Sequence, residues 1–198
     1  MAHKIKNKYD LSREFLELYS SLRSEKKKEW NRVLPFNELL IDRWEKAKFL
    51  KAKKGSSIYD NSYVFGDVSI GEKTWIGPLA ILDGSGAKNS IGNYCSISAG
   101  VQIYTHNSVN WALSGGKSKY KTNSVKIGSK CYLGPNSIIS MGSVIGSGSI
   151  IGAQTLVNGK VPPNSVIFGT PGKIVGKVKL VKKELIINYF DEPKDLKK

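Results

Sequence analysis

The sequence predicts an all-β solenoid, a parallel β-helix of six-residue repeats with an N-terminal α-helical segment and a short C-terminal element. Three observations support this fold class. An aliphatic residue recurs at every sixth position, the residue after it is commonly glycine, and a small or slender residue stands four positions after it. A period of six fits neither a helix nor an amphipathic strand, whose periods are about 3.6 and about 2. Self-similarity at a short fixed period is instead typical of a solenoid.

The aliphatic positions form three runs. Three hexapeptides close one triangular coil, so equivalent aliphatic side chains are expected to point inward and stack from coil to coil. The glycine is expected to supply a positive φ at the corner, because only glycine adopts one without strain. The runs are Ile58, Val64, Ile70, Ile76 and Leu82; then Ile91, Ile97 and Ile103; then Ile127, Leu133, Ile139, Ile145, Ile151 and Val157.

Two interruptions break the period. Residues 83–90 are predicted to form a small bulge at one corner. The second interruption, 104–124, adds 18 residues to the regular spacing, which is the length of a whole coil, but two of its three would-be inward positions are Gly115 and Lys121. It is therefore predicted to be an extruded loop, and a long loop on a rigid scaffold is where function usually lies.

The chain is expected to divide into a helical cap segment over 1–55, a β-helix domain over 56–178 and a C-terminal tail over 179–198. The tail is expected to pack back on a coil or on a neighbouring subunit. The cap segment would cover the apolar end of the first coil. An acceptor-binding role or weak contact with a membrane surface is the alternative, because 26–28 and 51–54 are strongly basic.

Two helices are expected in the cap segment. Helical periodicity over 11–30 has Asp10 placed to cap it. Pro35 suits the first turn of a second helix, since proline is tolerated there. That second helix would carry Leu39, Leu40, Trp44 and Ala47.

Composition limits the classes of function. The net charge of +15 attracts phosphate-rich partners, but no nucleic-acid-binding motif is present, so no nucleic-acid partner is expected. The apolar runs are too short for a transmembrane span, and the N-terminus lacks the apolar core of a secretory signal. Only two cysteines occur, which favours a reducing cytoplasm over a disulfide framework.

Few residues could carry chemistry. His3 lies in a polar N-terminal stretch, whereas His106 lies at the root of the extruded loop. Cys95 and Cys131 occupy the small inward position of their hexapeptides and are expected in the core. Leu82 and Ile103 fall on successive turns of one face, so Asp83 is the acid best placed to orient His106.

The repeat and the loop histidine resemble the hexapeptide-repeat acyltransferase family, whose coils wind left-handed, and within it the galactoside, maltose and polysaccharide O-acetyltransferases. The resemblance covers about 56–178. It implies acetyl-CoA as acyl donor, no metal, and a homotrimer in which donor and acceptor meet between subunits. In these relatives a loop histidine is the general base, which implies that role for His106. Many of them have Asp where this chain has Asn107, so His106 is expected to be a weaker base.

The end of the repeat resembles the coenzyme A signature of that family over 151–157, 161–165 and 169–173. The resemblance implies that the Ala153 amide meets the pantetheine arm, that Asn158 and Gly159 lie along it, and that Lys173 meets a phosphate. Gly172 stands where the family usually has Ala or Cys. Pro135 replaces a residue whose amide lies near the acetyl group in several relatives, so an oxyanion donor must come from another amide or from water.

The function these features favour is direct acetyl transfer to a sugar or glycan hydroxyl, as in polysaccharide modification. N-acetylation of a nucleotide-linked amino sugar, acetylation of a xenobiotic, and a non-catalytic scaffold are the alternatives. Asn107, Trp111 and Tyr120 are the expected acceptor-binding residues, with the two aromatic rings stacking on a sugar face. A γ-class carbonic anhydrase needs three histidines on one zinc ion, and His106 is the only usable histidine, so that class is excluded.

Overall fold

The structure, a computed structural model, describes residues 8–182 and 184–190. These residues fall into two compact units that divide between Asp42 and Arg43. His3, expected to be inert, lies outside the described residues. None of the helices in the described part of the chain is long and apolar enough to cross a membrane.

The first unit holds helices α1 (Lys8–Trp30) and α2 (Phe36–Leu40). The Phe36 ring packs against Phe15 and Tyr19 of α1, at centroid distances of 4.5 and 5.5 Å. Asp10 was predicted to cap α1 but lies inside its first turn, because the helix already begins at Lys8. A carboxylate there still interacts favourably with the helix dipole.

The predicted second helix is divided in two. Helix α2 ends at Leu40 because Ile41 is extended, with φ −110° and ψ 121°. A separate helix α3 (Arg43–Phe49) then begins directly after Asp42, and aspartate is favoured at a helix N-cap. The single helix expected over this stretch is therefore wrong, and α3 belongs to the second unit.

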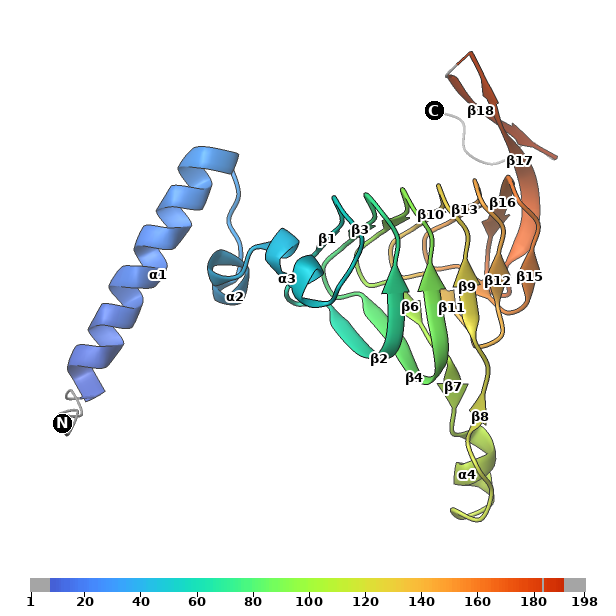
Figure 1. Cartoon of the computed structure of the whole chain (residues 1–198), viewed down its shortest axis with the longest axis horizontal. Coiled ribbons are helices and arrows are strands. Elements are labelled where there is room, and N and C mark those ends of the chain that lie inside the picture. The colour runs from blue at the N-terminus through green and yellow to red at the C-terminus, as the bar shows by residue number, and fades with distance from the viewer. Residues whose placement is uncertain (1–7, 183, 191–198) are drawn as a thin grey trace. The chain divides into compact units, whose positions relative to one another are not determined.

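The second unit is a left-handed parallel β-helix with three faces (Figure 1). Strands β2 (Tyr63–Ile70) and β4 (Ile81–Ile91) bend round a corner, beginning on the second face and ending on the third. The first face has β1 (Ser57–Ile58), β3 (Trp75–Ile76), β5 (Ser96–Ile97), β10 (Tyr132–Leu133), β13 (Ile150–Ile151) and β16 (Ser165–Phe168). The second continues with β6 (Gln102–Ile103), β11 (Ile138–Ile139) and β14 (Leu156–Val157), and the third with β9 (Val125–Ile127), β12 (Val144–Ile145) and β15 (Lys160–Val161).

The predicted inward residues form one aliphatic column on each face. Strand register pairs Ile58 with Ile76 and Ile76 with Ile97, and the other faces repeat this pattern. Leu82 and Ile103 are fully buried, and burying such a side chain stabilises the fold by about 1.5–3 kcal/mol. The predicted core is confirmed except that Val64 and Val68 are only partly buried against it. The small residues at the corners are buried: Ser62, Thr74, Ala80, Cys95, Val101, Cys131, Ser137, Ser143, Ser149 and Thr155.

The glycines after the aliphatic residues serve a different purpose from the one predicted. A β-carbon on Gly92 would lie 2.6 Å from the Ser129 nitrogen of the next coil, and one on Gly134 would lie 2.6 Å from the Ala153 nitrogen. These glycines permit close coil-to-coil approach. The left-handed φ falls two residues later, and it is adopted by larger residues such as Tyr94. The prediction of a positive φ at the glycines is wrong.

Helix α3 packs against β1 at the first coil, and its Ala47 is buried in the core cluster. Lys46 fastens this helix to the coil. Its Nζ donates to the carbonyl oxygens of Tyr59 and Ser62, at 3.1 and 2.9 Å, and to that of Asp60. Three carbonyl groups at the corner after β1 are thereby satisfied by one ammonium group.

Two elements extend from the solenoid (Figure 1). The loop between β6 and β9 holds β7 (His106–Asn107), α4 (Val109–Leu113) and β8 (Lys121–Thr122), with β7 and β8 antiparallel. After the last strand of the first face, β17 (Lys173–Val181) pairs antiparallel with β16, and β18 (Glu184–Tyr189) pairs antiparallel with β17. This hairpin is the short C-terminal element, and it continues the sheet of the first face.

Candidate active site

Both interruptions of the repeat leave the solenoid at the same corner, between the second and third faces, on successive coils. Leu82 pairs with Ile103 before the corner, and Ile91 pairs with Ile127 after it. The bulge that follows Leu82 therefore lies beside the root of the loop that follows Ile103. Strand pairing at that root places His106 opposite Thr122.

The structure brings Asp83 and His106 together at this corner. The His106 Nδ1 atom lies 2.9 Å from Asp83 Oδ2. The Asp83 side chain is 5% exposed and that of His106 is 31% exposed. A buried carboxylate that contacts a partly exposed imidazole is the arrangement by which a histidine ring is held in one orientation.

Asp83 accepts several hydrogen bonds besides the one to His106. Its Oδ1 accepts from the Ser85 amide and hydroxyl, at 3.0 and 2.5 Å. Its Oδ2 accepts from the Thr105 amide and hydroxyl, at 3.1 and 3.2 Å. The Thr105 oxygen in turn accepts from the amides of Gly86 and Ala87. The bulge and the loop root are thus joined through one carboxylate.

These bonds keep the carboxylate ionised. Burial on its own would raise the pKa of Asp83, but the bonds from Ser85, Thr105 and His106 outweigh it and lower that pKa to about 2. An ionised carboxylate only accepts, so His106 Nδ1 carries the hydrogen and donates it. The lone pair of the neutral ring then resides on Nε2. Within the described residues Nε2 makes no hydrogen bond.

Gly86 makes the approach of the bulge to the loop possible. A β-carbon at residue 86 would lie 2.6 Å from the His106 β-carbon and 3.0 Å from the Thr105 carbonyl oxygen. Real β-carbons do not tolerate such distances from neighbouring heavy atoms, so a larger residue would displace His106. From the sequence alone, Gly86 could be identified only as one residue of the predicted bulge, and not as a contact of His106.

A depression of about 450 Å³ opens beside the pair. Phe65, Ile81 and Tyr104 line it together with Asp83 and His106. Further lining comes from Ser85, Asn107, Ser108 and Val109. Burial, and secondarily the charge of Asp83, raises the pKa of Tyr104, so its phenol stays protonated and donates to Gln102 Oε1 at 2.8 Å. Sequence reasoning missed Phe65, Ile81 and Tyr104 because they point outward on neighbouring coils, where the repeat prescribes no residue type.

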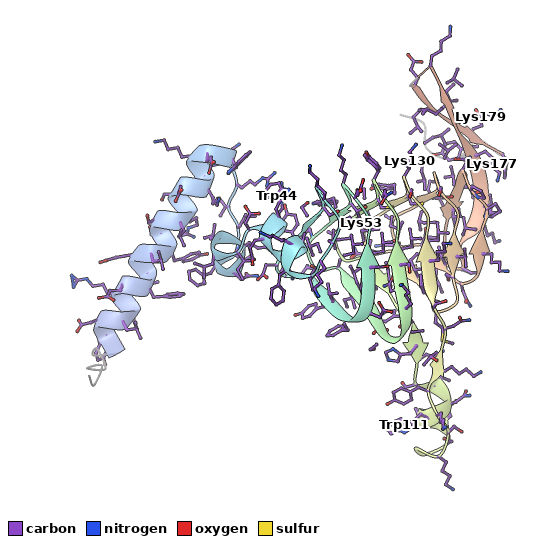
Figure 2. The ribbon with its side chains drawn as sticks, viewed as in Figure 1. Trp44, Lys53, Trp111, Lys130, Lys177 and Lys179 are labelled. Atoms are coloured by element: carbon purple, nitrogen blue, oxygen red, sulfur yellow. The ribbon has the colours of Figure 1, made fainter. Side chains whose placement is uncertain are left out.

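The expected acceptor-binding residues lie mostly within the loop's own packing. Tyr120 stacks on the His106 ring at 6.0 Å between centroids, and Trp111 meets Tyr120 edge-on at 5.8 Å. Figure 2 shows Trp111 on the extruded loop, away from the coils. Asn107 accepts from the Val109 amide and contacts Met141 on the next coil. Of the three, only Asn107 lines the depression.

The expected coenzyme A residues lie at the last coils. Ala153 is exposed at the corner that leads from the first to the second face, whereas Asn158 and Gly159 occupy the corner that leads from the second to the third. Lys173 is exposed at the start of β17. Gly172 is confined, since a β-carbon there would lie 2.8 Å from the Leu156 carbonyl oxygen. That contact explains why glycine stands where the resembling family has a larger residue.

The remaining candidate groups are structural. Cys95 and Cys131 are each 2% exposed, which confirms their expected place in the core, and their thiols contact carbonyl oxygens of the next coil. Pro135 is exposed at a corner, where its carbonyl oxygen accepts from the Gln154 amide. Across residues 8–182 and 184–190, no group of three or more His, Cys, Asp or Glu side chains could hold a metal ion.

Comparison with known proteins agrees with this architecture. Residues 124–159 match the family model described as bacterial transferase hexapeptide (six repeats). The chain is similar to the hexapeptide-repeat acetyltransferase VCA0836 of Vibrio cholerae, crystallised with acetyl coenzyme A, with 25% identity and a TM-score of 0.55 over 83% of this chain and 89% of that one. No curated protein sequence matches the chain.

Two further solved structures are similar. A maltose O-acetyltransferase from Clostridium difficile has 25% identity and a TM-score of 0.55, over 82% of this chain and 89% of that one. The polySia-specific acetyltransferase NeuO has 26% identity and a TM-score of 0.50, over 71% of this chain and 66% of that one. The repeat and the β-helix of this chain are thus similar to those of hexapeptide-repeat proteins, and these similar solved structures are acetyltransferases.

Proposed function

We propose that the protein transfers an acetyl group from acetyl-CoA to a hydroxyl of a sugar or glycan, with His106 as general base. The observation that carries this proposal is the hydrogen bond from His106 Nδ1 to the buried, ionised Asp83. It leaves Nε2 as the proton acceptor at the edge of a depression that could receive an acceptor. The similarity to a maltose O-acetyltransferase supports a sugar hydroxyl as the acceptor.

The reaction needs no covalent enzyme intermediate. His106 Nε2 removes the proton from the acceptor hydroxyl as its oxygen attacks the thioester carbonyl carbon. The tetrahedral intermediate then collapses, the carbon–sulfur bond breaks, and the thiolate takes the proton from the imidazolium. The products are the acetyl ester and free coenzyme A. Asp83 holds the ring and stabilises its positive charge during the step.

The aromatic residues that line the depression are better placed to stack on a sugar ring than the aromatic residues of the loop. Phe65 and Tyr104 line it, and Phe65 is 48% exposed beside the partly exposed His106. An aromatic face of this kind offers apolar contact area to the carbon–hydrogen face of a sugar. Trp111 and Tyr120, by contrast, pack on each other. We therefore assign acceptor stacking to Phe65 and Tyr104, with Asn107 as a polar contact.

The donor site is proposed at the last coils. The Ala153 amide would meet the pantetheine arm, Asn158 and Gly159 would lie along it, and Lys173 would pair with a phosphate as a point charge. These residues lie on two corners of one protomer. A homotrimer, in which neighbouring subunits enclose donor and acceptor together, supplies the second wall that such an open surface needs.

An acceptor screen tests this function. Purified protein with acetyl-CoA would be tested against maltose, galactosides, amino sugars, nucleotide-linked amino sugars and chloramphenicol, and free thiol would be measured. We expect thiol release with a hydroxyl acceptor and an ester product by mass spectrometry, with His106→Ala as the matched blank. An amide product, or thiol release that His106→Ala leaves unchanged, would contradict the proposal.

A further inference from the structure

The lysines are distributed unevenly along the β-helix. Between Asp83 and Glu184 the sequence has no aspartate or glutamate, yet it contains twelve lysines. The extruded loop alone carries Lys117, Lys119 and Lys121. The later coils and the loop are therefore cationic without internal neutralisation, whereas the earlier coils hold the acidic residues of the solenoid.

Five of these lysines lie on the bulge, on the extruded loop and on the strand that follows it, and are named the loop-root lysines: Lys88, Lys117, Lys119, Lys121 and Lys126. All five are exposed. Strand pairing places Lys121 opposite Asn107, while Lys126 pairs with Ser90, two residues after Lys88. The cluster is thus anchored to the two strands that carry Asp83 and His106.

Little negative charge offsets this cluster. The Asp83 carboxylate is buried and engaged by Ser85, Thr105 and His106. Asp67 is an exposed carboxylate on the preceding coil, and its backbone lies against Gly84. Among the described residues, none of the loop-root lysines forms an ion pair.

The loop-root lysines do not line the depression. Its lining, among the described residues, includes no lysine or arginine. In the β7–β8 hairpin, Lys121 pairs with Asn107, which lines the depression, so Lys121 stands next to its lining without being part of it. A single sugar held against Phe65 and Tyr104 stays within that lining. A chain that continues past the site reaches the lysines.

We infer that the acceptor is an anionic glycan polymer, whose flanking units carry carboxylate or phosphate groups that the loop-root lysines bind. This inference rests on the proposed function for the reacting sugar. The unit to be acetylated occupies the depression, which no lysine lines, and the flanking units pair with exposed ammonium groups. Such pairs are weak singly and strongly screened by salt, so several must act together.

Binding to two anionic probes tests the inference separately from acetyl transfer. The full chain would be titrated with polygalacturonate for the carboxylate, with dextran phosphate for the phosphate, and with neutral dextran of equal length. We expect binding to at least one anionic polymer at low salt, strong weakening at high salt, and no binding to neutral dextran. Polyuridylate that binds more tightly than either glycan would overturn the inference in favour of nucleic acid.

Matched variants locate the binding. Lys119→Gln/Lys121→Gln removes two loop-root charges, and Lys53→Gln/Lys54→Gln removes two charges before the first coil, where Figure 2 labels Lys53. We expect the first variant to weaken glycan binding roughly three- to thirtyfold and the second to change it less than twofold. Coenzyme A affinity and oligomer size should stay unchanged in both. Equal losses in both variants, loss of coenzyme A affinity, or dissociation of the assembly by the loop variant would each overturn the inference.

His106→Ala separates this inference from the proposed function. It should bind the anionic polymer as tightly as the native chain while releasing no thiol. If the lysine variants weaken binding but no hydroxyl acceptor is acetylated, the anionic surface stands and the proposed function fails. If a neutral free sugar is acetylated at full rate and neither anionic polymer binds, the proposed function stands and the inference fails.

Discussion

Replacing Asp83 with asparagine should cost stability and activity together, because one carboxylate satisfies groups from both the bulge and the loop root. Its two oxygens accept from the Ser85 amide and hydroxyl, the Thr105 amide and hydroxyl, and His106 Nδ1. Asparagine presents one oxygen and one NH₂ group. Whichever way its amide is turned, the NH₂ group faces a backbone amide that also donates, so that amide loses its partner.

The size of the effect follows from the pKa of Asp83. A fall from the ordinary value of 3.8 to about 2 corresponds to about 2 kcal/mol of stabilisation by the ionised form. A buried amide left without a partner costs about 1–3 kcal/mol, which is of the same size. We therefore expect Asp83→Asn to lower the free energy of unfolding by about 2 kcal/mol at pH 7.

The pH dependence has a definite sign. Because the pKa is lower in the folded chain than in the unfolded one, the stabilisation is complete above about pH 4 and is lost as the pH falls towards 2. The difference in unfolding free energy between native chain and variant should stay constant from pH 7 to about pH 5. It should shrink between about pH 4 and pH 2.

Urea unfolding at fixed protein concentration measures this difference, with Asp67→Asn as the matched control. Asp67 is an exposed carboxylate at the same corner of the preceding coil, and it should contribute less than about 0.5 kcal/mol. The acetyl-transfer rate of Asp83→Asn should also fall about a hundredfold or more, because the imidazole is no longer held in one tautomer. The reasoning would be refuted if Asp83→Asn lowered the free energy of unfolding equally at pH 7 and pH 2.5, or if Asp67→Asn lowered it as much as Asp83→Asn.

Two further substitutions follow from close contacts. Gly86→Ala places a β-carbon 2.6 Å from that of His106, so we expect the turnover rate to fall about a hundredfold. In the control Gly115→Ala the β-carbon meets nothing within 4 Å, so the variant should keep most of its turnover even though the φ of 61° strains alanine by about 1–2 kcal/mol. A Gly86→Ala enzyme of native activity would show that this approach is dispensable. Lys46→Met removes the donor to three carbonyl groups and should cost about 2–4 kcal/mol in thermal or urea unfolding, while Lys48→Met on the exposed side of α3 should stay within about 0.5 kcal/mol. Equal losses for the two lysines would contradict the role given to Lys46.

The solenoid and its core could be predicted because the same packing requirement recurs in every coil. Every coil needs an aliphatic residue at the same inward position, and the register of Leu82 with Ile103 follows from counting alone. The same count placed Asp83 beside His106, where their side chains meet. The roles of both in catalysis stay predictions.

The glycines and the depression could not be predicted in the same way. Residue 92 must be glycine because a β-carbon there would collide with the Ser129 nitrogen of another coil. The cause is a contact between coils and not the φ of Gly92 itself. Ser85 and Thr105 hold the carboxylate through bonds within the bulge and across to the loop root, and neither follows from a period of six. Phe65 and Tyr104 line the site from outward positions, where the repeat leaves residue type free.

The rate of acetyl transfer by His106→Ala tests the central claim most directly. With saturating acetyl-CoA and the acceptor found in the screen, thiol release should fall about 10²–10⁴-fold, the usual contribution of a general base. Coenzyme A affinity, measured by calorimetry, should remain near that of the native chain, since His106 lies on the loop root and the proposed donor site lies on the last coils. Turnover close to the native rate in this variant would show that another group removes the proton.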